Sequence, residues 1–209
     1  MTTASLPVAS SRFPRPHATT NYQSGASLIM ALLILVIVSI LGVSAAQIAS
    51  MAERGSRNDR DMQIAWQASE AALMDAEFDI HGPNSAASNR LSTFTGSSNL
   101  GAFAASCGSG ERKGLCAVST SGKPTWLAVD FTDANTVAQL GEFTGRSFAA
   151  GTAGPQPALK PRYIIEALCD TARQRDRSDP CTKLIYRITA MGFGPREDIQ
   201  AVTQTVYRN

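Results

Sequence analysis

The sequence predicts an α+β fold in which a long N-terminal α-helix, half transmembrane and half amphipathic, packs on a small antiparallel β-sheet. An uncharged apolar run from Ala26 to Val43 is the first observation. No proline interrupts the chain between Pro16 and Pro83, so one helix can extend far beyond that run. Segments rich in β-branched and aromatic residues then close the chain, as expected of strands.

The apolar run predicts a membrane-spanning helix. No charged residue occurs from Ala26 to Ala52. A helix of that length reaches about 40 Å at a rise of about 1.5 Å per residue, which exceeds a hydrocarbon core of about 30 Å. We therefore expect residues 26–52 to form the transmembrane half of the long helix and residues 53–209 to form a head domain.

Residues 1–25 are expected to be a leader. They contain Arg12 and Arg15, have no acidic residue and end at Gly25, directly before the apolar run. Cleavage after Gly25 is one interpretation, and a retained cytoplasmic tail is another. An ordinary secretory signal cleaved after Ala46 is disfavoured, because the apolar segment exceeds the usual hydrophobic region of about 7–15 residues.

Residues 47–80 predict the amphipathic half of the helix. Mostly apolar residues recur at steps of three and four and should face the sheet, with Trp66 and Leu73 buried. The helix should end at His81-Gly82-Pro83, because glycine ends helices and proline cannot continue them. The stripe comprises Met62, Ala65, Trp66, Ser69, Leu73, Ala76 and Ile80, whereas Asp59, Arg60, Gln63, Gln67, Glu70 and Asp75 should lie largely elsewhere.

The head domain is expected to be a loop-rich region followed by an antiparallel meander. Residues 82–106 are of low complexity, with a short helix at 86–94, and Gly108-Ser109-Gly110 predicts a tight turn. Short strands are expected at 115–118 and 125–129, with Trp126 pointing inward. The three clearest strands are Tyr163–Leu168, Lys183–Met191 and Ile199–Tyr207.

The four cysteines predict two disulfides. All follow the apolar run, and no histidine or Cys-x-x-Cys knuckle accompanies them, so a zinc site is disfavoured. Local pairing closes short loops at low entropic cost, which predicts Cys107–Cys116 and Cys169–Cys181. Disulfides form in oxidising compartments, so the head domain should lie outside the cytoplasm; the basic residues flanking the helix do not decide its orientation.

The composition gives no sign of an enzyme, a cofactor, a metal site or a nucleic-acid interface. The net charge is +2, and outside the leader 17 basic residues face 17 acidic ones, which argues against a nucleic-acid footprint. The histidines are His17 and His81, and no serine is marked as a partner for a catalytic triad. The acids considered as calcium ligands, which lack the required spacing, are Asp170, Asp176, Asp179 and Asp198.

The segment from Ala52 to Glu77 resembles the N-terminal region of PilX-type minor pilins, within the type IV pilin-like superfamily. That family repeats a Glu-Arg pair, an Asn-x-Arg stretch and an Ala-Phe-Gln-Ala-Ala-Glu-Ala-Ala-Leu core. Here Trp66 replaces the usual Phe and Ser69 the usual Ala. Gly114-Leu115-Cys116, with Trp126 downstream, and the strand Tyr186–Ala190 are also similar to that family.

The resemblance implies a type IV pilin fold and a role in the pilus. It implies that prepilin peptidase cuts between Gly25 and Ala26, that Ala26 is N-methylated, and that the chain passes from the bacterial inner membrane, with its head in the periplasm, into the extracellular fibre. Its expected partners are the major pilin, other minor pilins, the peptidase and the inner-membrane assembly platform.

Two departures from the major-pilin pattern point to a specialised role. Major pilins usually carry an acid at the fifth mature residue, which here is Met30, and begin with Phe rather than Ala26. We expect a subunit that primes assembly and sits at or near the fibre tip. A pseudopilin of a type II secretion system and a single-pass membrane-anchored adhesin are the alternatives.

Overall fold

A computed structural model of the chain describes residues 25–95, 100–151, 154–173, 181 and 183–208. The leader residues 1–24 and the acids Asp176 and Asp179 lie outside the described residues. The chain separates into two compact units, Met1–Met51 and Ala52–Asn209. The division lies one residue before the boundary expected from the charge pattern.

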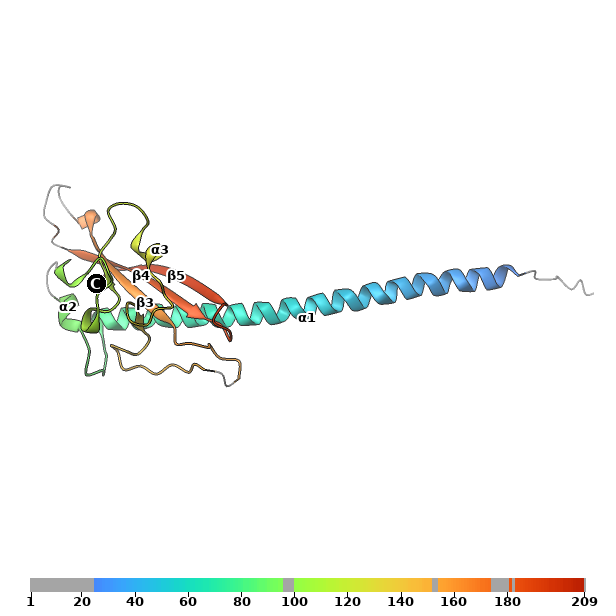
Figure 1. Cartoon of the computed structure of the whole chain (residues 1–209), viewed down its shortest axis with the longest axis horizontal. Helices are drawn as coiled ribbons and strands as arrows, with labels where there is room; N and C mark the ends of the chain where they lie inside the picture. Colours follow the sequence, from blue (N-terminus) through green and yellow to red (C-terminus); the bar gives the residue numbers. More distant parts are fainter. Residues whose placement is uncertain (1–24, 96–99, 152–153, 174–180, 182, 209) are drawn as a thin grey trace, which may run out of the picture. The chain divides into compact units, whose positions relative to one another are not determined.

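The long helix is present and ends where the sequence predicts. Helix α1 spans Ala26–His81 without interruption (Figure 1). Gly82 follows it with φ of +76°, a conformation that favours glycine. Its amide donates a hydrogen bond to the Phe78 carbonyl at 2.7 Å, which satisfies one of the last helical carbonyls.

The sheet lies in the second unit and has the strand order β1-β3-β4-β5, with β2 also paired to β3. The predicted meander is confirmed, because β3 pairs antiparallel with β4 and β4 antiparallel with β5. The sheet is nevertheless mixed, since β1 runs parallel to β3. The long connection between them allows the crossover that a parallel pair needs. The strands are β1 Leu115–Cys116, β2 Ala138–Gln139, β3 Arg162–Cys169, β4 Leu184–Phe193 and β5 Gln200–Tyr207.

The remaining helices are short, and one replaces a predicted strand. The strand expected at 125–129 is wrong, because Pro124 at the start of this segment favours a helical turn. Trp126 is half-buried beside Phe131 and Val137. The helix expected at 86–94 is confined to its last residues. These elements are α2 Leu91–Thr95, α3 Thr125–Ala128, η1 Leu100–Ala102, η2 Gly110–Arg112 and η3 Thr171–Arg173.

Alanines, rather than large side chains, carry the contact between α1 and the sheet. Ala65, Ala68, Ala72 and Ala76 are fully buried, whereas Trp66 is 51% exposed. The prediction that Trp66 is buried against the sheet was therefore wrong. The cause is the closeness of the layers: a Cβ added to Gly192 in β4 would meet the Ala65 carbonyl oxygen at 2.1 Å.

The sheet has a core on each face. The helix face buries Ile80, Tyr163, Ile165 and Ile188 in one cluster with the alanines of α1. The alternate residues of β3 point to the opposite face of the sheet. There Ile164 packs with Phe131, Val137 and both cysteines of the first pair. The loops that follow α1 therefore cover the face of the sheet that the helix does not.

The close packing predicts an unusual order of stabilities in a fragment of residues 53–209. Gly192→Ala should cost about 1–3 kcal/mol, because the added methyl group is forced against the backbone of α1. Trp66→Ala should cost less, since half of that side chain is already in water. Urea denaturation of both variants measures the order. A larger loss for Trp66→Ala would show that the alanines do not carry the contact.

Candidate functional site

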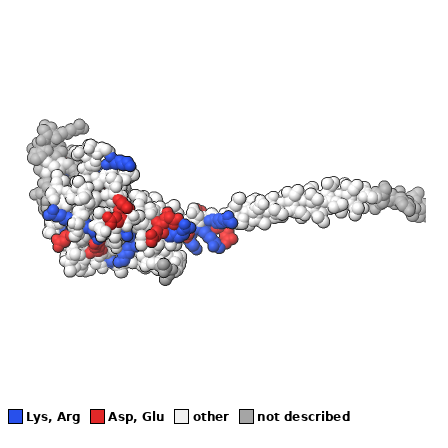
Figure 2. All heavy atoms as spheres, in the orientation of Figure 1, with Lys and Arg blue, Asp and Glu red and all other residues white. Residues whose placement is uncertain are grey.

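The apolar half of α1 is uncovered in the single chain. The helix is long and apolar enough to cross a membrane, and its most apolar stretch is not buried. Its large side chains from Leu28 to Met51 are all exposed. Figure 2 shows no charged atoms along this stretch of helix. So large an apolar surface requires lipid or other helices to cover it.

The hydroxyls of Ser39, Ser44 and Ser50 in this half bond to carbonyls of their own helix. Ser39 Oγ donates a hydrogen bond to the Leu35 carbonyl at 2.7 Å, and Ser44 Oγ to the Ile40 carbonyl at 2.9 Å. Hydroxyls bonded to the preceding turn can reside in hydrocarbon. The first charged residues follow directly after the apolar half, where Glu53 and Arg57 form an ion pair at 2.6 Å.

The first turn of α1 carries no acid. Gly25 precedes the helix with φ of +37°, in the left-handed region, and open space surrounds its Cα. Ala26 is the first helical residue, and Met30 lies one turn later with its side chain 66% exposed. The residues proposed for processing therefore share one end of the helix with the uncharged position, while the rest of the leader lies outside the described residues.

At its other end α1 is fastened to the head by a buried carboxylate, Asp79. Arg90 Nη2 donates to Asp79 Oδ2 at 2.6 Å, and its Nε lies 3.0 Å from both carboxylate oxygens. Tyr163 of β3 donates its hydroxyl to the same carboxylate at 2.9 Å. All three side chains are buried, and burial raises the pKa of Tyr163 well above its usual value. Helix, loop and sheet thus meet at one anion.

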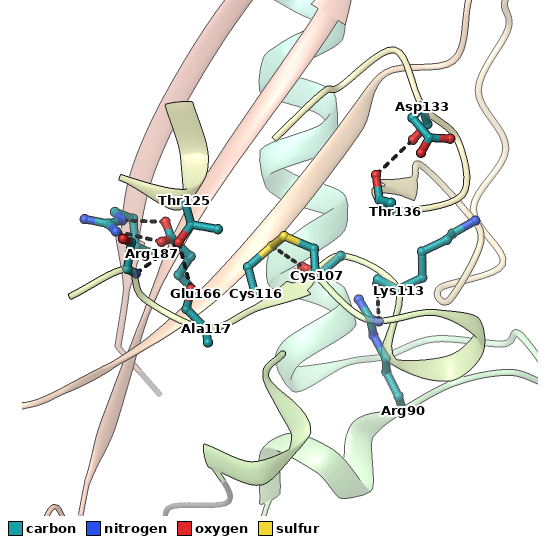
Figure 3. Close-up of a disulfide and its surroundings, with 12 residues drawn as sticks. Arg90, Cys107, Lys113, Cys116, Ala117, Thr125, Asp133, Thr136, Glu166 and Arg187 are labelled. Atoms are coloured by element: carbon teal, nitrogen blue, oxygen red, sulfur yellow. Dashed lines mark hydrogen bonds and ion pairs between the residues drawn. A yellow bond between two sulfur atoms is a disulfide. The ribbon is translucent and has the colours of Figure 1, made fainter. Parts of the chain in front are cut away.

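Arg90 extends this network into the loop that contains the first disulfide. Its Nη1 donates to the carbonyls of Glu111 at 3.0 Å and Lys113 at 2.6 Å, and its guanidinium lies 3.7 Å from the centre of the Phe143 ring. Figure 3 shows Arg90 beside Lys113 and the Cys107–Cys116 bridge. A guanidinium bonded on two sides fixes the loop relative to α1.

A second buried acid, Asp75, holds the loop after β2. Its carboxylate accepts hydrogen bonds from the Gly141 amide at 2.8 Å and the Thr144 hydroxyl at 2.6 Å. Burial raises the pKa of Asp75, against the opposing effect of these two bonds. The prediction that Asp75 lies away from the buried face was wrong. Its spacing from Ala68 and Ala72 was the available signal, because steps of seven and three place it on their face.

The described cysteines form two disulfides, Cys107–Cys116 and Cys169–Cys181. The first is fully buried and lies at the edge of β1. Nearby, Glu166 of β3 and Arg187 of β4 face each other in register, joined by two hydrogen bonds of 2.8 Å (Figure 3). Sequence reasoning missed this cross-strand pair, because a single acid within a strand, Glu166, carries no local signal of its partner.

His81, Asp170 and Asp198, which the sequence analysis considered for catalysis or metal binding, have structural contacts, whereas His17, like Asp176 and Asp179, lies outside the described residues. His81 stacks between the rings of Phe78 and Tyr207, with centroid distances of 5.6 and 5.4 Å. Asp170 lies 3.2 Å from Arg208, and Asp198 lies 2.6 Å from Arg196. Within the described ranges, no three His, Cys, Asp or Glu side chains are grouped to hold a metal ion.

Two family models match the chain. Residues 24–73 match the PilX N-terminal model, and residues 112–209 match the model described as type IV pilus assembly protein PilX C-term. The chain belongs to the PilX family. No curated protein and no solved structure matches it.

Membership of the PilX family makes the chain a minor pilin, a structural component of type IV pilus assembly. The N-terminal match, over residues 24–73, covers Gly25, Ala26 and Met30, the positions at which the sequence predicts processing and a missing acid. Asp79 and Arg90 lie between the two matched regions. The fastening of this PilX head to its helix therefore depends partly on residues outside the family models.

Breaking the Asp79–Arg90 pair should strongly destabilise the head. Asp79→Ala leaves a buried guanidinium without its anion, at a cost of about 3–5 kcal/mol in a fragment of residues 53–209. Asp198→Ala is the control, because it breaks an exposed pair with the same 2.6 Å separation and should cost less than about 1 kcal/mol. Equal losses in urea denaturation would contradict the role of Asp79.

The raised pKa of Asp75 predicts that the difference in stability between the native chain and Asp75→Asn depends on pH. The folded chain holds the Asp75 proton more tightly than the unfolded chain, whose pKa is near 3.8. Stability from this group is therefore present at low pH and lost as pH rises from 3.8 through the raised folded value. Asparagine does not titrate. The stability of Asp75→Asn relative to the native chain should increase as the pH rises above 3.8, and the opposite trend would show a lowered pKa.

Proposed function

We propose that this chain is a non-enzymatic minor pilin that helps to prime type IV pilus assembly and sits at or near the fibre tip. The observation that carries the proposal lies at the start of α1. Met30 is the fifth residue of the helix, and major pilins usually carry an acid at that position. The uncovered apolar helix and the match to models of a pilus assembly protein support the pilus as its setting.

Met30 makes the assembly helix chemically one-sided. A buried ammonium without a counterion costs several kcal/mol, on the order of the penalty for any unpaired buried ion. A subunit with a carboxylate in its first turn can neutralise the amino terminus of the subunit already above it. This chain has no such group, but its own terminus at Ala26 can receive a carboxylate from a subunit added below. It therefore suits the first, distal position.

Maturation follows from the same end of the helix. Prepilin peptidase would cut between Gly25 and Ala26 and N-methylate Ala26, leaving residues 26–52 as the assembly half of the helix. The head, residues 53–209, would lie in the periplasm before assembly, and the two disulfides suit that compartment. The partners would be the major pilin, other minor pilins, the peptidase and the inner-membrane assembly platform.

Processing is tested by blocking the residue before the cut. Gly25→Val should leave the precursor at full length, because a branched side chain replaces the residue that fits the peptidase and cannot readily adopt φ of +37°. Gly42→Val is the matched control, since Gly42 also has open space around it but lies within the apolar run. N-terminal sequencing should find Ala26 first in the control and in the native chain. A mature chain beginning at Gln47 would instead identify an ordinary secretory signal.

Priming is tested by deleting the protein. Loss of a subunit needed to start fibres should reduce the number of surface pili while leaving the subunit composition of the remaining pili almost unchanged. Counting pili by electron microscopy, together with mass spectrometry of sheared fibres, measures both quantities. A normal number of pili of altered composition would indicate a shaft component rather than a primer.

A further inference from the structure

The free edge of β5 lacks the features that usually prevent strands from pairing. Among the described residues β5 pairs only with β4, so its other side is open. Its eight residues include no charge, no proline and no glycine. Native edge strands are normally shortened, charged or bulged because they otherwise accept another strand. At the opposite side of the sheet β1 and β2 have two residues each, so only the β5 edge is long.

The ladder to β4 shows which backbone groups of β5 face outward. The Gly194 amide donates to the Ile199 carbonyl at 2.8 Å, so this pair is a hydrogen-bonded one. Bonded and non-bonded pairs alternate in an antiparallel ladder. The amides and carbonyls that point away from β4 therefore belong to Gln200, Val202, Gln204 and Val206. Val202 and Val206 are also 47% and 59% exposed, which leaves the edge accessible.

The helix flank beside this edge is largely apolar, and it includes Glu70, whose carboxylate accepts a hydrogen bond from the Trp66 indole at 2.7 Å. Asp75 contacts Gly141 and Thr144, which follow β2, so its flank of α1 lies on the β2 side of the sheet. Trp66 is nine residues earlier, about 180° around the helix, and lies on the β5 side. Exposed Met62 and half-buried Leu73 share that flank. A strand added to β5 would cover these side chains with every second residue.

We propose that the free edge of β5 docks one extended segment of another protein, uncharged and apolar at alternate positions. The lack of charge from Gln200 to Tyr207 fits an uncharged strand, and the Met62–Trp66 flank fits its apolar residues.

The direction of α1 disfavours a second copy as the occupant. Symmetric pairing of two β5 edges would make the two α1 helices antiparallel, whereas copies anchored in one membrane run in the same direction; this step rests on the proposed membrane anchor. A side-by-side copy would have to offer β1 or β2, which are too short to cover β5.

The test uses the full chain in detergent micelles and a labelled synthetic peptide, Thr-Val-Thr-Val-Thr-Val-Thr-Val, which is uncharged and apolar at alternate positions. Val206→Lys places a charge on the edge, and Val202→Pro removes one outward amide while leaving the ladder to β4 intact. Leu127→Lys is the matched control, because Leu127 is 57% exposed in α3, away from the edge. Circular dichroism of each variant checks that the fold is retained.

Fluorescence anisotropy should show peptide binding about tenfold weaker in Val202→Pro, as expected for the loss of one hydrogen bond. Binding should also weaken in Val206→Lys, because the docked strand would have to cover a charge, and should be unchanged in Leu127→Lys. In cells, a photo-crosslinking residue at position 206, but not at 127, should join the chain to a different polypeptide, and Val202→Pro should abolish the adduct. Equal peptide binding by all variants would overturn the proposal, as would an adduct between two copies of this chain. Neither readout depends on position in the fibre, so either failure leaves the proposed function standing.

Discussion

The close contact between the alanine face of α1 and β4 is the constraint on which the head depends. Gly192 and Gly194 bring β4 so near to the helix that added Cβ atoms would meet the backbone at Ala65 and Asp61. Small residues must therefore line the helix, and large apolar ones are displaced to its flank. The same proximity places Asp75 and Asp79 in the interior, where they survive only because loops and β3 supply hydrogen-bond donors.

The two halves of α1 thus differ in how their apolar side chains are covered. In the half beyond Ala52, the sheet covers the alanines, and buried carboxylates attach the surrounding loops. In the half before it, the aliphatic side chains are exposed among the described residues, and three serine hydroxyls bond their own helix. The first half can be stabilised only by lipid or by other helices that cover it.

The sequence predicted features governed by local chemistry. The end of α1 at Gly82, the three long strands and the antiparallel meander are confirmed, because glycine and β-branched residues act through their own backbone preferences. Features set by packing were not predicted. The burial of Asp75 instead of Trp66 depends on how near β4 approaches, and the parallel pairing of β1 depends on where a long connection returns. The edge of β5 was readable as a strand, but its openness required knowledge of strand order.

The central claim is that the missing acid at Met30 places this subunit at the start of the fibre. Gold-labelled antibody against the head domain, applied to intact pili, tests it most directly. The account predicts label at distal ends in the native chain, and label along the shaft when Met30→Glu restores a carboxylate that can neutralise the neighbour above. Label spaced evenly along native pili would contradict the tip position while leaving membership of the PilX family intact.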